Sequence, residues 1–315
     1  MTRLRFIVLT IGPPAILVAA YTLCFPAHDH EQATQVAQFV EAEATAALER
    51  AGRHDALAAA CAVEARTVLP SLPKSSHLLI RPPFVIAGDL SEAELENLYE
   101  QAVLPVTSGL WRSYFDHKPD APVTIVALRG DASFAAAAAE LDGYESSSYA
   151  GYTQRGQRRI VVNLATGRGT LAHELSHLLA LFDFPGMPEW FDEGLASLHE
   201  ETVFSDDGLT LIGVENWRSR LLHDALHRKQ LPALESVIRN PAFRGEGEGL
   251  NYAIVRGFCH YLQERGLLSH FYRKFRDGVQ QDPTGSATLC ELLGAADIGE
   301  VDRQFRSWLE ARAGR

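Results

Sequence analysis

The stretch TLAHELSHLLA, Thr170 to Ala180, sets two histidines four residues apart in an apolar segment and places a glutamate directly after the first. On an α-helix, residues four apart project from one face at a distance of about 6 Å, so His173 and His177 can share one ion. Glu174 is rotated by about 100° from His173, which keeps it off the ion but close enough to act as a base. Core histidines satisfied by hydrogen bonds are the alternative interpretation.

A zinc ion that also holds a water molecule needs a third protein ligand. After the break DFPGMP, the segment PEWFDEGLASLHEE, which begins at Pro188, carries apolar residues at i, i+4 and i+7 and predicts a second helix with one buried stripe. Glu193 lies on another face of this helix. By itself Glu193 would be interpreted as a solvent-facing glutamate. Because a short Pro/Gly turn folds the helix back on its predecessor, we expect Glu193 to be the third zinc ligand.

These two segments, together with LNYAIVRGFCHYLQERG at Leu250 to Gly266, resemble the gluzincin metallopeptidases. They are most similar to the peptidase MA-like group, which occurs in many bacterial extracytoplasmic proteins. The resemblance covers roughly residues 83–278. It implies a thermolysin-like fold with an HExxH active-site helix and a bound Zn²⁺.

The resemblance also implies roles for individual residues. In the family, the first segment supplies two zinc ligands and the base, and the second supplies the third ligand; by position these are His173, His177, Glu174 and Glu193. The third segment is similar to the helix whose tyrosine supports the oxyanion, which implicates Tyr252, although a boundary tyrosine with a satisfied hydroxyl is the alternative. Ser197 stands where thermolysin-like members carry an aspartate that orients a histidine, so no residue is assigned to that role.

The pattern around the motif predicts an α+β fold. Short β-branched runs predict strands at Phe84–Ala87, Val123–Leu128 and Ile160–Leu164, the last paired with a strand before the basic turn RGQRR. Asp89 or Ser91 is the expected cap of a long helix after the first strand. From about Glu201 the chain is mainly helical. We therefore expect a small mixed sheet followed by a mainly helical C-terminal lobe.

The N-terminus predicts contact with a membrane. Arg3 and Arg5 precede an uncharged, mostly apolar run from Phe6 to Phe25, long enough to cross a hydrocarbon core of about 30 Å. A cleaved signal peptide is the alternative, which would make the protein secreted. The expected organisation is a transmembrane anchor or signal peptide at 1–28, a helical spacer at 29–75, an α+β lobe with the zinc-binding helices at 76–202 and a helical lobe at 203–315.

Composition narrows the range of partners. The formal net charge of -11 opposes binding to nucleic acid. Beyond the apolar N-terminal run, Cys61, Cys259 and Cys290 are too few for a disulfide framework, although one bridge among them is allowed. Oligomeric state does not follow from the sequence.

The expected activity is hydrolysis of a peptide or protein substrate by a membrane-tethered zinc metallopeptidase. The protein is expected in a bacterial inner membrane with a single span and its catalytic part in the periplasm or outside. A zinc-activated water would attack, and Glu174 would move its proton to the leaving amine. Strand Ile160–Leu164 is the expected edge for an extended peptide, with an internally paired strand as the alternative. The alternative functions are a zinc-stabilised, non-catalytic binding or scaffold protein at the membrane surface, and hydrolysis of a non-peptide amide.

Overall fold

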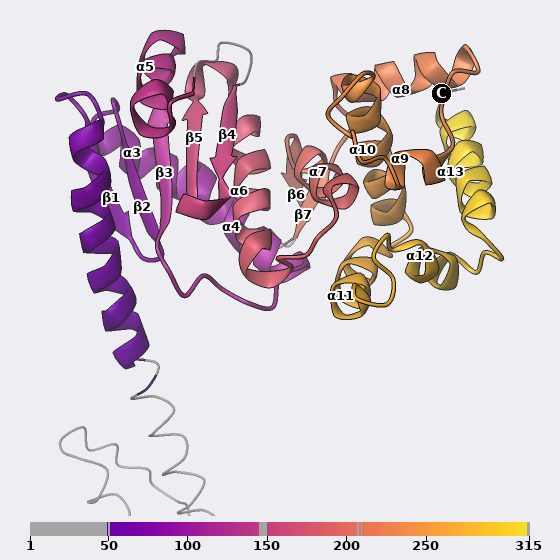
Figure 1. Cartoon of the computed structure of the whole chain (residues 1–315), viewed down its shortest axis with the longest axis horizontal. Helices are drawn as coiled ribbons and strands as arrows, with labels where there is room; N and C mark the ends of the chain where they lie inside the picture. The colour runs from indigo at the N-terminus through magenta and orange to yellow at the C-terminus, as the bar shows by residue number, and fades with distance from the viewer. Residues whose placement is uncertain (1–48, 50, 145–149, 207, 209, 314–315) are drawn as a thin grey trace, which may run out of the picture. The chain divides into compact units, whose positions relative to one another are not determined.

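The computed structural model describes residues 49, 51–144, 150–206, 208 and 210–313 (Figure 1). The chain divides into two units, residues 1–59 and 60–315. The expected anchor or signal peptide at 1–28 lies outside the described residues, as does the first part of the helical spacer. No helix within the described part of the chain is both long and apolar enough to span a membrane.

Residues 60–75 of the expected spacer belong to the second unit and pack on it. Residues 60–68 are helical, and Cys61, Ala65 and Val68 along one side of this helix are buried. The helix gives way to a 3₁₀ turn at Leu69–Ser71, where Pro70 cannot continue the α-helical hydrogen bonds. This segment is therefore part of the folded body. Cys61, Cys259 and Cys290 are all free thiols.

Five strands form one mixed sheet in the order β1-β2-β3-β5-β4. They are β1 (His77–Arg81), β2 (Phe84–Gly88), β3 (Val123–Leu128), β4 (Gly151–Gln154) and β5 (Arg159–Asn163). Pairs β2·β3 and β3·β5 are parallel, whereas β1 and β4 join antiparallel at the two sides. The structure is thus mixed α+β, and three expected strands lie within one residue of β2, β3 and β5. Strand β1 was not predicted.

Strand β5 corrects one prediction. The expected substrate edge, Ile160–Leu164, is internally paired between β3 and β4. Among the described residues the outer strand on this side is β4, which pairs only with β5 through a register that aligns Gly151 with Val162 and Gln154 with Arg159. Because β4 and β5 have similar patterns in the sequence, the sequence could not show which of them pairs with β3. The basic residues RGQRR do form the turn between them, with Arg155–Gln157 as a 3₁₀ turn.

Both faces of the sheet are buried. Alternate residues, such as Ile86, Ile125 and Ile160, join a large core with the helices on one face. On the other face, Val126 and Val161 pack with residues of the 60–68 helix and of α5 (Asp131–Asp142). This double burial explains the continuous β-branched runs of the central strands, which are typical of parallel sheets covered on both sides.

A long helical segment begins at the predicted cap. Ser91 accepts a hydrogen bond from the Glu94 amide while the Glu94 side chain accepts one from the Ser91 amide, which makes a capping box. Helix α3 (Glu92–Leu98) then passes through a π-helical turn, Tyr99–Val103, into α4 (Leu104–Ser113). Asp89, the other cap candidate, instead accepts from the Arg129 amide.

Three packed helices carry the candidate site. Helix α6 (Gly169–Asp183) lies against β4 and β5, α7 (Glu189–Leu198) packs on α6, and α10 (Glu248–Glu264) packs on α7 (Figure 1). Gly194 allows the close approach of α7 and α10, because a Cβ there would lie 2.9 Å from both Cys259 Sγ and Val255 O. Burial on nearly all sides of α7 follows from this arrangement.

The C-terminal part is mainly helical, as expected. Its further helices are α8 (Trp217–His227), α9 (Leu234–Ile238), α11 (Leu268–Gly278), α12 (Ser286–Leu293) and α13 (Ile298–Ala313). A two-stranded hairpin of β6 (Thr202–Phe204) and β7 (Leu211–Gly213) interrupts the helical part and was not predicted. Three-residue strands leave too short a pattern for recognition.

Substitution Gly194→Ala should destabilise the fold by about 1–3 kcal/mol, because the added methyl group meets backbone of α10 that cannot move freely. Chemical denaturation measures this loss. Gly249→Ala is the matched control, since its Cβ would meet only Leu221 Cδ2 at 3.9 Å. Equal stability of the two variants would contradict the close α7–α10 contact.

Candidate metal centre

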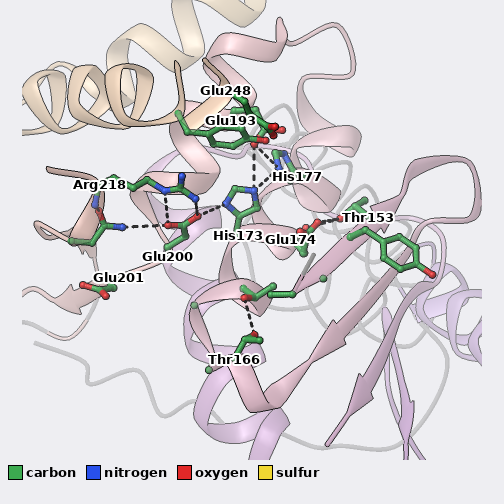
Figure 2. Close-up of a pocket in the computed structure, with 18 of the residues that line it drawn as sticks. Thr153, Thr166, His173, Glu174, His177, Glu193, Glu200, Glu201, Arg218 and Glu248 are labelled. Carbon is green, nitrogen blue, oxygen red and sulfur yellow. Dashed lines mark hydrogen bonds and ion pairs between the residues drawn. The ribbon is translucent and has the colours of Figure 1, made fainter. Parts of the chain in front are cut away.

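The predicted site residues line one cavity of about 900 Å³ (Figure 2). Strand β4 forms one wall, α6 the floor with His173, Glu174 and His177, and α7 contributes Glu193. Residues from α8 and from the first turn of α10, including Tyr252, complete the lining. All five residues singled out in the sequence therefore meet at a single cavity.

Two imidazoles and one carboxylate converge within this cavity. The Nε2 atoms of His173 and His177 lie 3.0 Å apart. Oε2 of Glu193 lies 3.4 Å from each of these nitrogens. Glu193 is 1% exposed, so the helix face that looked solvent-facing in isolation is buried against α6. Figure 2 shows the three side chains pointing toward one another.

The donor set fits a divalent cation. Tetrahedral zinc ligands at their usual bond lengths of about 2.0–2.1 Å lie about 3.3 Å from each other, close to the separations of the two Nε2 atoms and Glu193 Oε2. Oε2 of Glu193 is buried, and no described residue gives it a hydrogen bond of good geometry. A buried carboxylate oxygen facing two imidazole nitrogens is the chemistry that zinc prefers.

In the metal-free protein, protons on the two imidazoles balance the negative charge of the buried carboxylates. Burial alone would lower the pKa of His173, but the facing carboxylates of Glu193 and Glu200 outweigh it and raise the pKa to about 9. Burial likewise opposes protonation of His177, yet Asp192 and Glu193 raise its pKa well above the usual range. Burial would raise the pKa of Glu193, but the two imidazoles hold it well below its ordinary value. A cation that bound here would have to displace these protons.

Each imidazole has a second carboxylate on its outer nitrogen. His177 Nδ1 donates to Asp192 Oδ1 over 2.7 Å, and His173 Nδ1 lies 3.2 Å from Glu200 Oε1. A carboxylate at Nδ1 keeps the proton there and leaves the Nε2 lone pair directed inward. Asp192 thus takes the orienting role that Ser197 could not supply.

Three arginines hold the carboxylates around the site. Arg218 contacts Glu200 through Nη2 at 2.9 Å and Nε at 3.2 Å. Arg155 forms an ion pair with Oδ2 of Asp192. Arg244 forms ion pairs with Oε1 of Glu193, and with Glu189 at 2.9 Å. All three arginines line the cavity.

Glu174 projects into the cavity beside β4. It is 8% exposed, and its Oε2 accepts a hydrogen bond of 2.7 Å from Thr153 Oγ1. Figure 2 shows this pair to the side of the two imidazoles. Glu174 lies outside the cluster of His173, His177 and Glu193, in keeping with the rotation expected on the helix.

Tyr252 lines the cavity near the candidate ligand Glu193 and near Arg218 and Arg244. Its ring packs on Phe243 with centroids 5.4 Å apart, and the Arg218 guanidinium lies 5.0 Å from its centroid. Burial and the adjacent Glu193 carboxylate raise the pKa of Tyr252, so its hydroxyl stays protonated at neutral pH. The phenol is therefore kept as a hydrogen-bond donor.

The outer carboxylates and their arginines were not predicted from the sequence. Asp192 directly precedes Glu193, and Glu200 lies seven residues after Glu193, just beyond the end of α7. A spacing of seven residues, about two helical turns, could have indicated a second acid near the same face. The arginines come from the 3₁₀ turn after β4, from α8 and from the segment before α10, and no local pattern, the basic turn RGQRR included, connected them to the site.

Comparison with known proteins gives no match: no protein-family model fits the chain, and no curated protein matches its sequence.

Protein kept free of metal should lose stability as the pH rises from 6.5 toward 9. His173 has a pKa of about 9 in the folded chain against an ordinary 6.5, so its protonation stabilises the fold fully below pH 6.5 and no longer above 9. Glu200→Gln removes one of the two carboxylates and should lower the pKa of His173, which NMR titration of the imidazole measures. Glu201→Gln, which changes another acid lining the cavity, is the matched control; equal pKa values in both variants would contradict the His173–Glu200 contact.

Proposed function

We propose that this chain is a zinc-dependent metallopeptidase of the gluzincin, peptidase MA-like type. The observation that carries the proposal is the convergence of His173, His177 and Glu193 at 3.0–3.4 Å beside Glu174 in one cavity. A purely structural zinc site has no need of an acid next to the ligand cluster. The cavity, at about 900 Å³, also offers room for a substrate segment.

Zinc bound by these three residues would polarise the scissile carbonyl and make water a nucleophile near neutral pH. The chain's own residues prepare for this. Asp192 accepts a hydrogen bond from Nδ1 of His177, and Glu200 lies 3.2 Å from Nδ1 of His173, so that the Nε2 atoms of both rings face Glu193. Arg244 holds Oε1 of Glu193, which leaves Oε2 free for the cation.

Glu174 acts as the general base in this proposal. Thr153 fixes its carboxylate at the cavity wall, and one carboxylate oxygen can take a proton from the attacking water and return it to the leaving amine. Tyr252, kept protonated by burial and by Glu193, donates to the developing oxyanion. Both groups lie on the cavity that also holds the ligand cluster.

The substrate is an extended peptide that pairs with β4. Gly151, Tyr152 and Thr153 of this strand line the cavity, and β4 is the outer strand of the described sheet on that side. A peptide added there places its backbone beside Glu174 through main-chain hydrogen bonds. Strand β4 thus replaces β5 as the expected substrate edge, because β5 is already paired on both sides, with β3 and β4.

Location at a membrane is supported by the N-terminal sequence. The apolar run Phe6–Phe25 after Arg3 and Arg5 favours a single span with the catalytic part outside the cytoplasm, in a bacterial periplasm or beyond. Cleavage after the run would instead release the protein.

Substitution Glu174→Gln should leave zinc content unchanged and lower the rate of peptide cleavage by about 100- to 10,000-fold, because the base is lost while all three ligands remain. Metal analysis and a peptide-library digest measure the two effects. Glu248→Gln, another acid of the cavity lining, is the matched control. Undiminished cleavage by Glu174→Gln would exclude it as the base, and a wild-type protein that binds zinc but cleaves nothing would support the scaffold alternative.

Zinc should bind with one ion per chain, and more tightly as the pH rises toward about 9, because the cation displaces the proton of His173. Calorimetry in buffers of different ionisation enthalpy measures the released protons. Glu193→Gln should weaken binding strongly, whereas Glu248→Gln should not. Unchanged affinity in Glu193→Gln would remove it from the ligand set.

A further inference from the structure

Strand β4 is tied to the metal centre at two points. Thr153 within the strand donates to Glu174, and Arg155, the first residue after the strand, forms an ion pair with Asp192. Both side chains reach the α6–α7 side of the sheet, because Thr153 contacts Glu174 of α6 and Arg155 contacts Asp192 of α7. Gln154 between them is exposed. One tie ends at the proposed base, and the other ends at Asp192, which contacts the candidate ligand His177.

The Arg155 tie leads to the candidate ligand His177 through Asp192. Asp192 uses Oδ2 for Arg155 and Oδ1 for His177 Nδ1, at 2.7 Å, so one carboxylate bridges the two residues. The Asp192 side chain is only 5% exposed, whereas that of Arg155 is 46% exposed. A surface ion pair contributes little, but a buried carboxylate that loses its arginine is free to rotate. Rotation of Asp192 would alter the orientation of the imidazole that it contacts.

His177 differs in this respect from the other two candidate ligands. The arginine behind His173 is Arg218 of α8, and the arginine on Glu193 is Arg244, which precedes α10. Both come from the C-terminal helical part. Arg155, in contrast, comes from the 3₁₀ turn that joins β4 to β5.

We propose that Arg155 is a positioning residue that holds Asp192, and through it His177, so that strand β4 sets the geometry of the metal centre. The strand that would bind the peptide backbone thereby also orients a ligand. This inference rests on the proposed metal centre but not on peptidase activity, since it concerns the affinity and geometry of the bound ion.

The test compares four variants of the full chain, each prepared metal-free and then loaded with Zn²⁺ or Co²⁺. Arg155→Gln should weaken zinc binding in competition with a chelator by up to about 10- to 100-fold, the usual effect of losing a residue that, like Asp192, contacts a ligand directly. The visible absorption of bound Co²⁺ should change as well, because it reports ligand geometry. Arg155→Lys keeps the positive charge and should therefore retain part of the zinc affinity and part of the wild-type Co²⁺ absorption.

Two neighbouring positions provide matched controls. Thr153→Val breaks the other tie of β4 but touches no ligand, so zinc affinity and the Co²⁺ spectrum should match those of the wild type. Gln154→Ala removes an exposed side chain from the same strand and should also leave both unchanged. Thermal unfolding of each metal-free variant verifies that it is folded.

A double variant keeps the test decisive if Arg155→Gln is unstable. Because Arg155 acts through Asp192, the double variant with both Arg155→Gln and Asp192→Asn should bind zinc no more weakly than the single variant Asp192→Asn. Wild-type affinity in Arg155→Gln would overturn the inference, as would an equal loss in Thr153→Val, which would indicate general damage to β4. A wild-type protein that binds neither ion would instead refute the proposed metal centre, and this inference with it.

Discussion

The burial of Glu193 against two imidazoles is the constraint on which the site depends. A carboxylate that is 1% exposed is costly unless positive charge or a cation faces it, and here two histidines and Arg244 do so. The arrangement is reached only because α7 packs closely on both α6 and α10. Gly194, next to Glu193, permits that approach. The same packing contact thus stabilises the fold and assembles the three candidate ligands.

Outer carboxylates and arginines turn this cluster into an ordered site. Asp192 accepts a hydrogen bond from His177, Glu200 lies 3.2 Å from Nδ1 of His173, and arginines form ion pairs with both carboxylates. Each buried carboxylate therefore has a cationic side chain beside it, which offsets the repulsion between the carboxylates.

Much of the fold was readable from local patterns. The β-branched runs predicted β2, β3 and β5 to within a residue, and the Ser91 cap and the HExxH helix followed from short-range rules. Strand β1 and the β6–β7 hairpin were missed, because short or partly exposed strands have weak periodicity. The prediction that β5 is the outer strand was wrong. Strands β4 and β5 have similar sequence patterns, and their order in the sheet depends on which of them pairs with β3.

The local sequence determined the helix with His173, His177 and Glu174, because four-residue spacing on a helix is a property of the helix alone. It also supplied Glu193 as a candidate. Which acids stand behind the imidazoles, and which arginines hold them, depended on contacts between segments far apart in the chain. Arg244 lies 51 residues beyond Glu193, and Arg155 lies 37 residues before Asp192. No local period encodes such contacts, because they arise when the sheet and helices pack around one cavity.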